Sequence, residues 1–176
     1  MFHWLINKCI CTTNTNTNTN TNTNTNTNTN TNTNTKIKFS YEAVPFIPPI
    51  TSGHVIKVYD GDTITILSKL PYPESPVYKF SVRLNGIDCP EIKGESDDEK
   101  QCAQLAKREL ENQILNKQVT LKNLNTEKYG RILADVYLDE LHLNKHMLDK
   151  RLAVTYDGGK KSRPSSWLEY HLPNAK

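Results

Sequence analysis

The stretch HVIKVYDGDTITILSK, residues 54–69, decides the fold. Two runs rich in β-branched and aromatic residues, His54–Asp60 and Thr63–Lys69, flank Asp60-Gly61, a dipeptide typical of a hairpin turn. After a loop with three prolines, Tyr78–Ile87 alternates apolar and polar residues, which indicates a third strand. The domain is therefore expected to begin with a three-stranded meander.

A helix is expected next, with Asp97 and Asp98 as candidate N-caps and Glu99 in the first turn. Its apolar face consists of Cys102, Leu105, Ala106, Leu110 and Ile114. Two strands, Gln118–Leu124 and Arg131–Leu138, and a second helix, Leu141–Leu152, complete the pattern. The order β-β-β-α-β-β-α is that of the OB-fold, so we predict a mainly β fold with helices, built on a five-stranded antiparallel barrel.

Residues 1–50 differ in composition from the rest. Residues 13–35 alternate Thr and Asn without an apolar or charged side chain, so this low-complexity tract is expected to be disordered. All seven glycines lie at residue 53 or later. We therefore predict an N-terminal arm over residues 1–50 and one domain over residues 51–176.

Composition excludes several classes of protein. No apolar run approaches the roughly 20 residues of a membrane span, and Met1–Cys11 lacks the features of a clear signal peptide. The four cysteines include no CxxC pair, which predicts neither a zinc site nor a disulfide framework. A reducing, cytoplasmic location is favoured over secretion, and a monomer is expected.

The domain is nearly neutral. Residues 51–176 hold 19 Lys and Arg against 18 Asp and Glu, which leaves a charge of +1. Any binding to a polyanion must therefore come from placed cations and not from overall charge.

Two short segments concentrate acids: Asp60 and Asp62 in the hairpin turn, and Asp88 and Glu91 after the third strand. Neighbouring strands bring both pairs to one end of the barrel, where clustered carboxylates repel unless a cation or proton neutralises them. Oxygen ligands without His partners suit Ca²⁺ or Mg²⁺. Taken alone, each segment is better explained without a metal, the first as an ordinary Asp-Gly turn and the second as a proline-fixed strand exit.

Two arginines change this balance. Arg83 precedes Asp88 on the third strand, and Arg131 opens a later strand. A guanidinium matches two phosphate oxygens, and a metal, two arginines and a free carboxylate are the groups that phosphodiester hydrolysis requires. The alternatives are a surface ion pair for Arg83 and a solvated turn cation for Arg131.

Over residues 54–157 the chain resembles the staphylococcal nuclease (thermonuclease-like) family. The matching motifs are Val58-Tyr59-Asp60-Gly61-Asp62-Thr63, Val82-Arg83-Leu84-Asn85-Gly86-Ile87-Asp88-Cys89-Pro90-Glu91, Lys128-Tyr129-Gly130-Arg131, Leu143-Asn144 and Leu152-Ala153. Each motif is short, and their specificity comes from their shared order along the predicted strands.

This resemblance implies a calcium-dependent nuclease. Calcium ligands would be the Asp62 and Asp88 carboxylates and the backbone carbonyl of Cys89, with Asp60 shaping the site. The remaining roles that it implies are Glu91 as general base, Arg83 and Arg131 as phosphate clamps, and Lys128 and Tyr129 as partners of a terminal phosphate. Substrates would be single-stranded DNA or RNA, cut internally to leave 3′-phosphate ends, with other divalent metals such as Mg²⁺ left open.

Several positions depart from the family pattern. Cys89 stands where many members have Thr, and Arg151 stands where members often have Gly, which would cost stability if that position needs a positive φ. Asp157–Lys161 replaces aromatic residues, so Lys160, Lys161 and Arg163 are expected to contact the nucleic-acid backbone. The third helix is expected to be short, over Ser165–His171.

A non-catalytic OB-type module that binds nucleic acid or protein is the alternative function. Relatives that only bind have lost charged residues of the site, whereas this chain keeps all five: Asp62, Arg83, Asp88, Glu91 and Arg131. This retention favours hydrolysis.

Overall fold

The computed structural model describes residues 44–127 and 129–172. The Thr-Asn tract, most of the predicted N-terminal arm and Lys128 lie outside the described residues. No helix in the described ranges is both long enough and apolar enough to cross a bilayer. The domain boundary at residue 51 stays a prediction.

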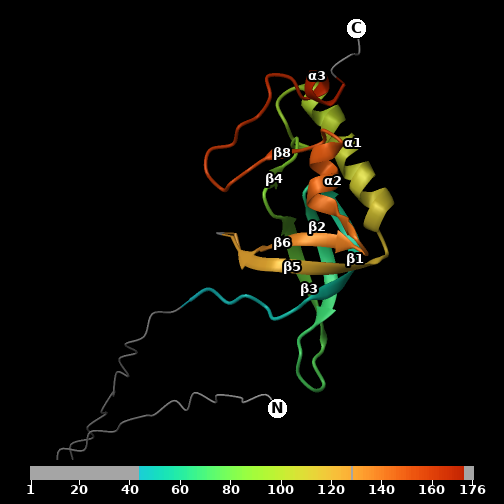
Figure 1. The fold of residues 1–176 in the computed structure, drawn as a ribbon, viewed down its shortest axis with the longest axis vertical. Coiled ribbons are helices and arrows are strands. Elements are labelled where there is room, and N and C mark those ends of the chain that lie inside the picture. The colour runs from blue at the N-terminus through green and yellow to red at the C-terminus, as the bar shows by residue number, and fades with distance from the viewer. Residues whose placement is uncertain (1–43, 128, 173–176) are drawn as a thin grey trace, which may run out of the picture. The chain divides into compact units, whose positions relative to one another are not determined.

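The described chain forms a small barrel with helices at one end, as Figure 1 shows. The elements are β1 (Ser52–Asp60), β2 (Thr63–Lys69), β3 (Val77–Leu84), β4 (Ile87–Asp88), α1 (Asp97–Ile114), β5 (Gln118–Thr126), β6 (Ile132–Leu138), β7 (Leu141–His142), α2 (Leu143–Asp149), β8 (Val154–Thr155) and α3 (Trp167–His171). The loop between β2 and β3, which holds the predicted proline-rich segment, extends from the opposite end of the barrel.

The predicted five-stranded OB-type barrel is confirmed, with one correction. The strands follow the order β3-β2-β1-β5-β6, and β3 closes the ring against β6. This closing pair is parallel, with Val82 opposite Ile132 and Leu84 opposite Ala134, whereas we expected an antiparallel barrel. A closed ring with an odd number of strands cannot alternate direction throughout, so one parallel pair is unavoidable.

The core lies inside the barrel and under α1. Buried aliphatic side chains from all five barrel strands meet the face of α1 that carries Ala106, Leu110 and Ile114. Leu105, which we assigned to this face, is 36% exposed instead. Burial of each large aliphatic side chain contributes about 1.5–3 kcal/mol, so this face fixes α1 against the barrel.

Three predicted boundaries were wrong. The third strand is divided at Asn85-Gly86, where Gly86 has a φ of 77°, so β4 leaves the barrel as a separate strand and pairs with β8. Helix α1 is capped by Ser96, whose Oγ accepts the Glu99 N–H at 3.1 Å, while the predicted Asp caps occupy the first turn. Helix α2 is shorter than predicted, because β7 pairing precedes it and a tight turn ends it.

Asn144 fastens α2 to the barrel. Its buried side chain accepts the Val136 N–H at 2.9 Å and donates to the carbonyl oxygens of Asn85 and Ala134. Both sides of the amide are therefore satisfied by backbone groups of β6 and of the β3–β4 turn. This contact holds the turn that directs β4, and with it Asp88, toward the end of the barrel.

Arg151 is expected to strain the end of α2. Its φ is 55°, and its N–H and that of Leu152 bond to the carbonyl oxygens of Leu148 and Met147, the Schellman arrangement that favours glycine. The Arg151 side chain also donates to the Tyr170 carbonyl oxygen, so Arg151→Ala is the matched reference. We expect Arg151→Gly to be more stable than Arg151→Ala by about 1 kcal/mol in urea unfolding. Equal stability of the two variants would contradict this assignment.

Candidate active site

The helical end of the barrel brings together charged residues from the β1–β2 turn and from strands β3 and β4. Asp62 directly precedes β2, Arg83 lies near the end of β3, and Asp88 ends β4. Gly61 makes this approach possible, since a Cβ there would lie 2.8 Å from the Cys89 sulfur and 2.7 Å from Ala106. Any other residue at position 61 would push the β1–β2 turn away from β4 and α1.

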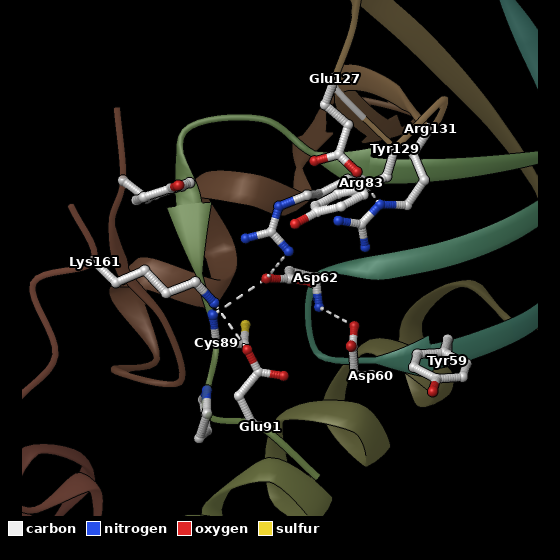
Figure 2. A pocket seen from close by; sticks show the side chains of 12 residues that line it. Tyr59, Asp60, Asp62, Arg83, Cys89, Glu91, Glu127, Tyr129, Arg131 and Lys161 are labelled. Atoms are coloured by element: carbon white, nitrogen blue, oxygen red, sulfur yellow. Dashed lines mark hydrogen bonds and ion pairs between the residues drawn. The ribbon is translucent and has the colours of Figure 1, made fainter. Parts of the chain in front are cut away.

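Arg83 lies at the centre of the site. Its Nη1 is 2.6 Å from Asp62 Oδ2, and its Nη2 is 3.1 Å from Asp88 Oδ1 and 3.2 Å from the Ile87 carbonyl oxygen. All three charged side chains are buried, so the alternative of a surface ion pair for Arg83 was wrong. The two predicted metal carboxylates therefore flank one guanidinium, as Figure 2 shows for Asp62.

Arg131 is linked to the Asp62 carboxylate through Thr63. Its Nη1 donates to Thr63 Oγ1 at 3.3 Å, and that hydroxyl donates to Asp62 Oδ1 at 2.9 Å. Its Nε pairs with Glu127, so the alternative of a solvated turn cation was also wrong. Figure 2 shows Arg131 and Arg83 on the same side of Asp62.

Glu91 lies at the rim of the site and pairs with two cations from the segment that follows β8. Lys161 Nζ is 2.8 Å from Glu91 Oε1 and also 2.8 Å from Asp88 Oδ1. Arg163 Nη2 is 2.9 Å from Glu91 Oε1. We expected Lys161 and Arg163 to face nucleic acid, and the structure instead places both in ion pairs with acids.

The cluster carries more negative than positive charge. In the described part of the chain, five carboxylates, those of Asp60, Asp62, Asp88, Glu91 and Glu99, adjoin three cations, those of Arg83, Lys161 and Arg163. With every carboxylate ionised, the negative charges outnumber the positive ones by two. Burial raises the pKa of Asp62 to about 7, and repulsion from Asp60 adds to this, although Arg83 acts in the opposite direction.

Cys89 lies beneath the cluster. Its N–H donates to Asp62 Oδ2 at 3.3 Å, and its side chain is buried against Gly61. Burial raises the pKa of the thiol well above its usual value, and the negative charge of Asp62 raises it further. The sulfur is therefore a neutral packing group.

A cavity of about 400 Å³ opens over the cluster. It is lined by Tyr59, Asp60, Asp62, Arg83, Cys89, Pro90, Glu91, Glu127, Tyr129, Arg131, Tyr156 and Lys161. Tyr129 is 72% exposed at its rim. Exposed aromatic rings beside Arg83 and Arg131 suit a ligand with both a phosphate and a flat base.

The donor set fits a hard divalent cation. Asp62 and Asp88 offer carboxylate oxygens, and Asp88 Oδ2 is buried without a hydrogen-bond partner among the described residues, although Arg163 Nε lies 3.5 Å away. No three His, Cys, Asp or Glu side chains form a metal cage within residues 44–127 and 129–172. Two carboxylates, one with an oxygen that lacks a hydrogen-bond partner within the described structure, are the type of ligand that Ca²⁺ or Mg²⁺ prefers.

The family model for staphylococcal nuclease homologues matches residues 81–171, slightly more than half of the chain. The chain belongs to the staphylococcal nuclease family. The match spans six of the predicted site residues that the structure places together: Arg83, Asp88, Cys89, Glu91, Tyr129 and Arg131.

Curated proteins similar to this chain include named endonucleases. A probable endonuclease of Schizosaccharomyces pombe is 30% identical over 60% of this chain and 56% of its own length. Uncharacterized endonucleases of Haemophilus influenzae and Escherichia coli are 32% and 28% identical, over 58% and 60% of this chain and 51% and 61% of their own lengths. The chain thus spans little more than half the length of these relatives.

Of the predicted site residues, the structure gathers Asp62, Arg83, Cys89, Glu91, Tyr129 and Arg131 around one cavity, with Asp88 joined to them through Arg83 and Lys161. Lys128 lies outside the described residues. The roles assigned to these side chains stay predictions. The sequence did not indicate the parts played by Thr63, Glu99, Glu127 or the Lys161 and Arg163 ion pairs.

Proposed function

We propose that this chain is a metal-dependent nuclease that cuts single-stranded DNA or RNA internally and leaves 3′-phosphate ends. The observation that carries this proposal is the buried Arg83 bridge between Asp62 and Asp88, beside Glu91 and Arg131 in one cavity. Family membership and the endonuclease names of three relatives support the same reaction class.

The metal would be held by the carboxylates of Asp62 and Asp88 and by the Cys89 carbonyl oxygen. A bound divalent cation would offset the negative charge that develops on the attacked phosphate. The family is generally calcium-dependent, and Ca²⁺ is our first choice of cofactor because its coordination geometry is flexible, whereas Mg²⁺ demands a near-ideal octahedral arrangement of ligands.

The chain's own residues would divide the remaining work. Arg83 and Arg131 direct guanidinium N–H groups at the phosphate, and Lys128 and Tyr129 hold a neighbouring phosphate of the strand. Glu91 takes a proton from the attacking water at its carboxylate. The new bond joins the water oxygen to phosphorus, the bond from phosphorus to the 5′-oxygen breaks, and solvent protonates the leaving oxygen.

Replacing Glu91 with glutamine is expected to lower the cleavage rate about 10²–10⁴-fold, because an amide cannot accept the proton of water. A labelled single-stranded oligonucleotide is incubated with Ca²⁺ or with a chelator and resolved on a gel. Wild type should shorten the strand only with metal, and Glu95→Gln, an exposed acid four residues away, should behave as wild type.

Two results would contradict this proposal: equal wild-type cleavage with and without the chelator, or full activity of Glu91→Gln. Retention of the oligonucleotide that weakens steeply with salt, without any shortened product, would favour the non-catalytic binding module instead.

A further inference from the structure

We propose that Arg163, held by the buried Glu99, is a positioning residue that sets the direction of the Glu91 carboxylate. The proposal rests on the nuclease function proposed above. The two residues come from the first turn of α1 and from the segment between β8 and α3, for which the sequence predicted other roles.

The Arg163 guanidinium joins three acids. Its Nη2 is 2.9 Å from Glu91 Oε1, its Nη1 is 3.3 Å from Glu99 Oε1, and its Nε is 3.5 Å from Asp88 Oδ2. A planar fork that engages separate carboxylates along two edges has little rotational freedom left. Arg163 thereby fixes the Glu91 carboxylate relative to Asp88, a predicted metal ligand, and to Glu99 on α1.

Glu99 anchors this arrangement because it binds both the guanidinium and the backbone of Glu91. Only 8% of the residue is exposed, and its Oε1 accepts the Glu91 N–H at 3.1 Å. The turn after Glu91 wraps around this carboxylate: the Gly94 N–H bonds to the Glu91 carbonyl oxygen at 2.8 Å, and a Cβ at Gly94 would collide with the Glu99 carboxylate. Glu99 Oε1 thus holds the backbone of Glu91 directly and its side chain through Arg163.

Glu91 needs such support, since its side chain is 45% exposed and follows the last residues of β4 in a loop. Fixing an unrestrained Glu side chain costs up to about 2 kcal/mol of conformational entropy. If the folded protein does not already hold the side chain in place, this cost adds to the barrier of the reaction. Lys161 and Arg163 both contact Oε1, so none of these ion pairs occupies Oε2. That oxygen stays available to a water molecule.

Arg163→Met and Glu99→Gln test the proposal, with Arg151→Met as the matched control. Arg151 also ties the C-terminal segment to the fold, through the Tyr170 carbonyl oxygen, but does not contact the acids. We expect kcat for oligonucleotide cleavage to fall at least tenfold in both test variants, KM to change less than twofold, and the control to match wild type. Arg163→Lys should recover part of kcat, because it keeps the charge without the fork.

A double-mutant cycle separates positioning from a general structural effect. In the Glu91→Gln background, with residual cleavage followed at enzyme excess, Arg163→Met should cause no further loss, because its effect passes through Glu91. A full further tenfold loss, or a loss that lies in KM, would overturn the proposal.

Hydrogen exchange keeps the test independent of activity. In the metal-free protein, Glu99→Gln and Arg163→Met should each speed exchange of the Glu91 amide at least fivefold, and Arg151→Met should not. Unchanged exchange in both test variants would overturn the proposal. A wild type that cleaves nothing but shows this exchange pattern would contradict the nuclease function and leave the positioning contact supported.

Discussion

Replacing Arg83 with methionine is expected to lower the free energy of unfolding by about 3–5 kcal/mol, the usual cost of removing one partner of a buried ion pair. The substitution would leave Asp62 and Asp88 buried without the guanidinium that lies between them. Burial already disfavours the charged form of Asp62, so loss of the Arg83 guanidinium would make that form still less stable. Urea unfolding in the presence of a chelator measures the loss.

The matched control removes charge from the other side of the pair. Asp62→Asn in the Arg83→Met background should recover part of the lost stability, because one uncompensated buried charge disappears. A loss below about 1 kcal/mol in Arg83→Met would mean that water reaches the pair and that the site is not buried in solution.

Replacing Arg131 with alanine is expected to lower kcat/KM about 10²–10³-fold, or about 3–4 kcal/mol of barrier, as for loss of a single donor to a developing oxyanion. Its effect on folding should stay below about 1 kcal/mol, because the side chain is partly exposed and its pair with Glu127 lies near the surface. Steady-state kinetics and urea unfolding of the same preparation separate the two effects.

Arg108→Ala serves as the control for Arg131→Ala. Arg108 is an exposed cation on α1 whose one hydrogen bond within the described ranges is to the Gln104 carbonyl oxygen, and it does not line the cavity. Its removal lowers the total charge equally. A loss of less than tenfold in Arg131→Ala, or an equal loss in Arg108→Ala, would contradict the assignment of Arg131 as a phosphate clamp.

Local patterns predicted the strands and most of the site. Alternation along the strands and the Asp60-Gly61 turn were sufficient for the barrel order, and neighbouring strands were sufficient to bring Asp62 near Asp88. The break in the third strand was missed because apolar Leu84 and Ile87 lie on either side of Asn85-Gly86, so the strand pattern continues through the turn. The parallel closure was missed because it depends on the parity of the whole ring and on no local pattern.

The ion pairs of Glu91 could not be predicted for a different reason. Lys161 and Arg163 lie 70 and 72 residues beyond Glu91, in a segment without strand or helix periodicity. Glu99 reads as an ordinary first-turn acid, and its burial follows only from the path of the Glu91–Gly94 turn. Contacts of this kind are set by tertiary packing, which leaves no pattern in sequence.

The placement of Cys89 also bears on chemical damage. Oxidants and alkylating reagents attack thiols that are exposed and ionised. The Cys89 thiol is buried under the β1–β2 turn, and its raised pKa keeps it protonated. Peroxide would reach it only when the β1–β2 turn lifts away. Cysteines at many catalytic centres are readily inactivated by oxidation, whereas the fold protects Cys89 from it.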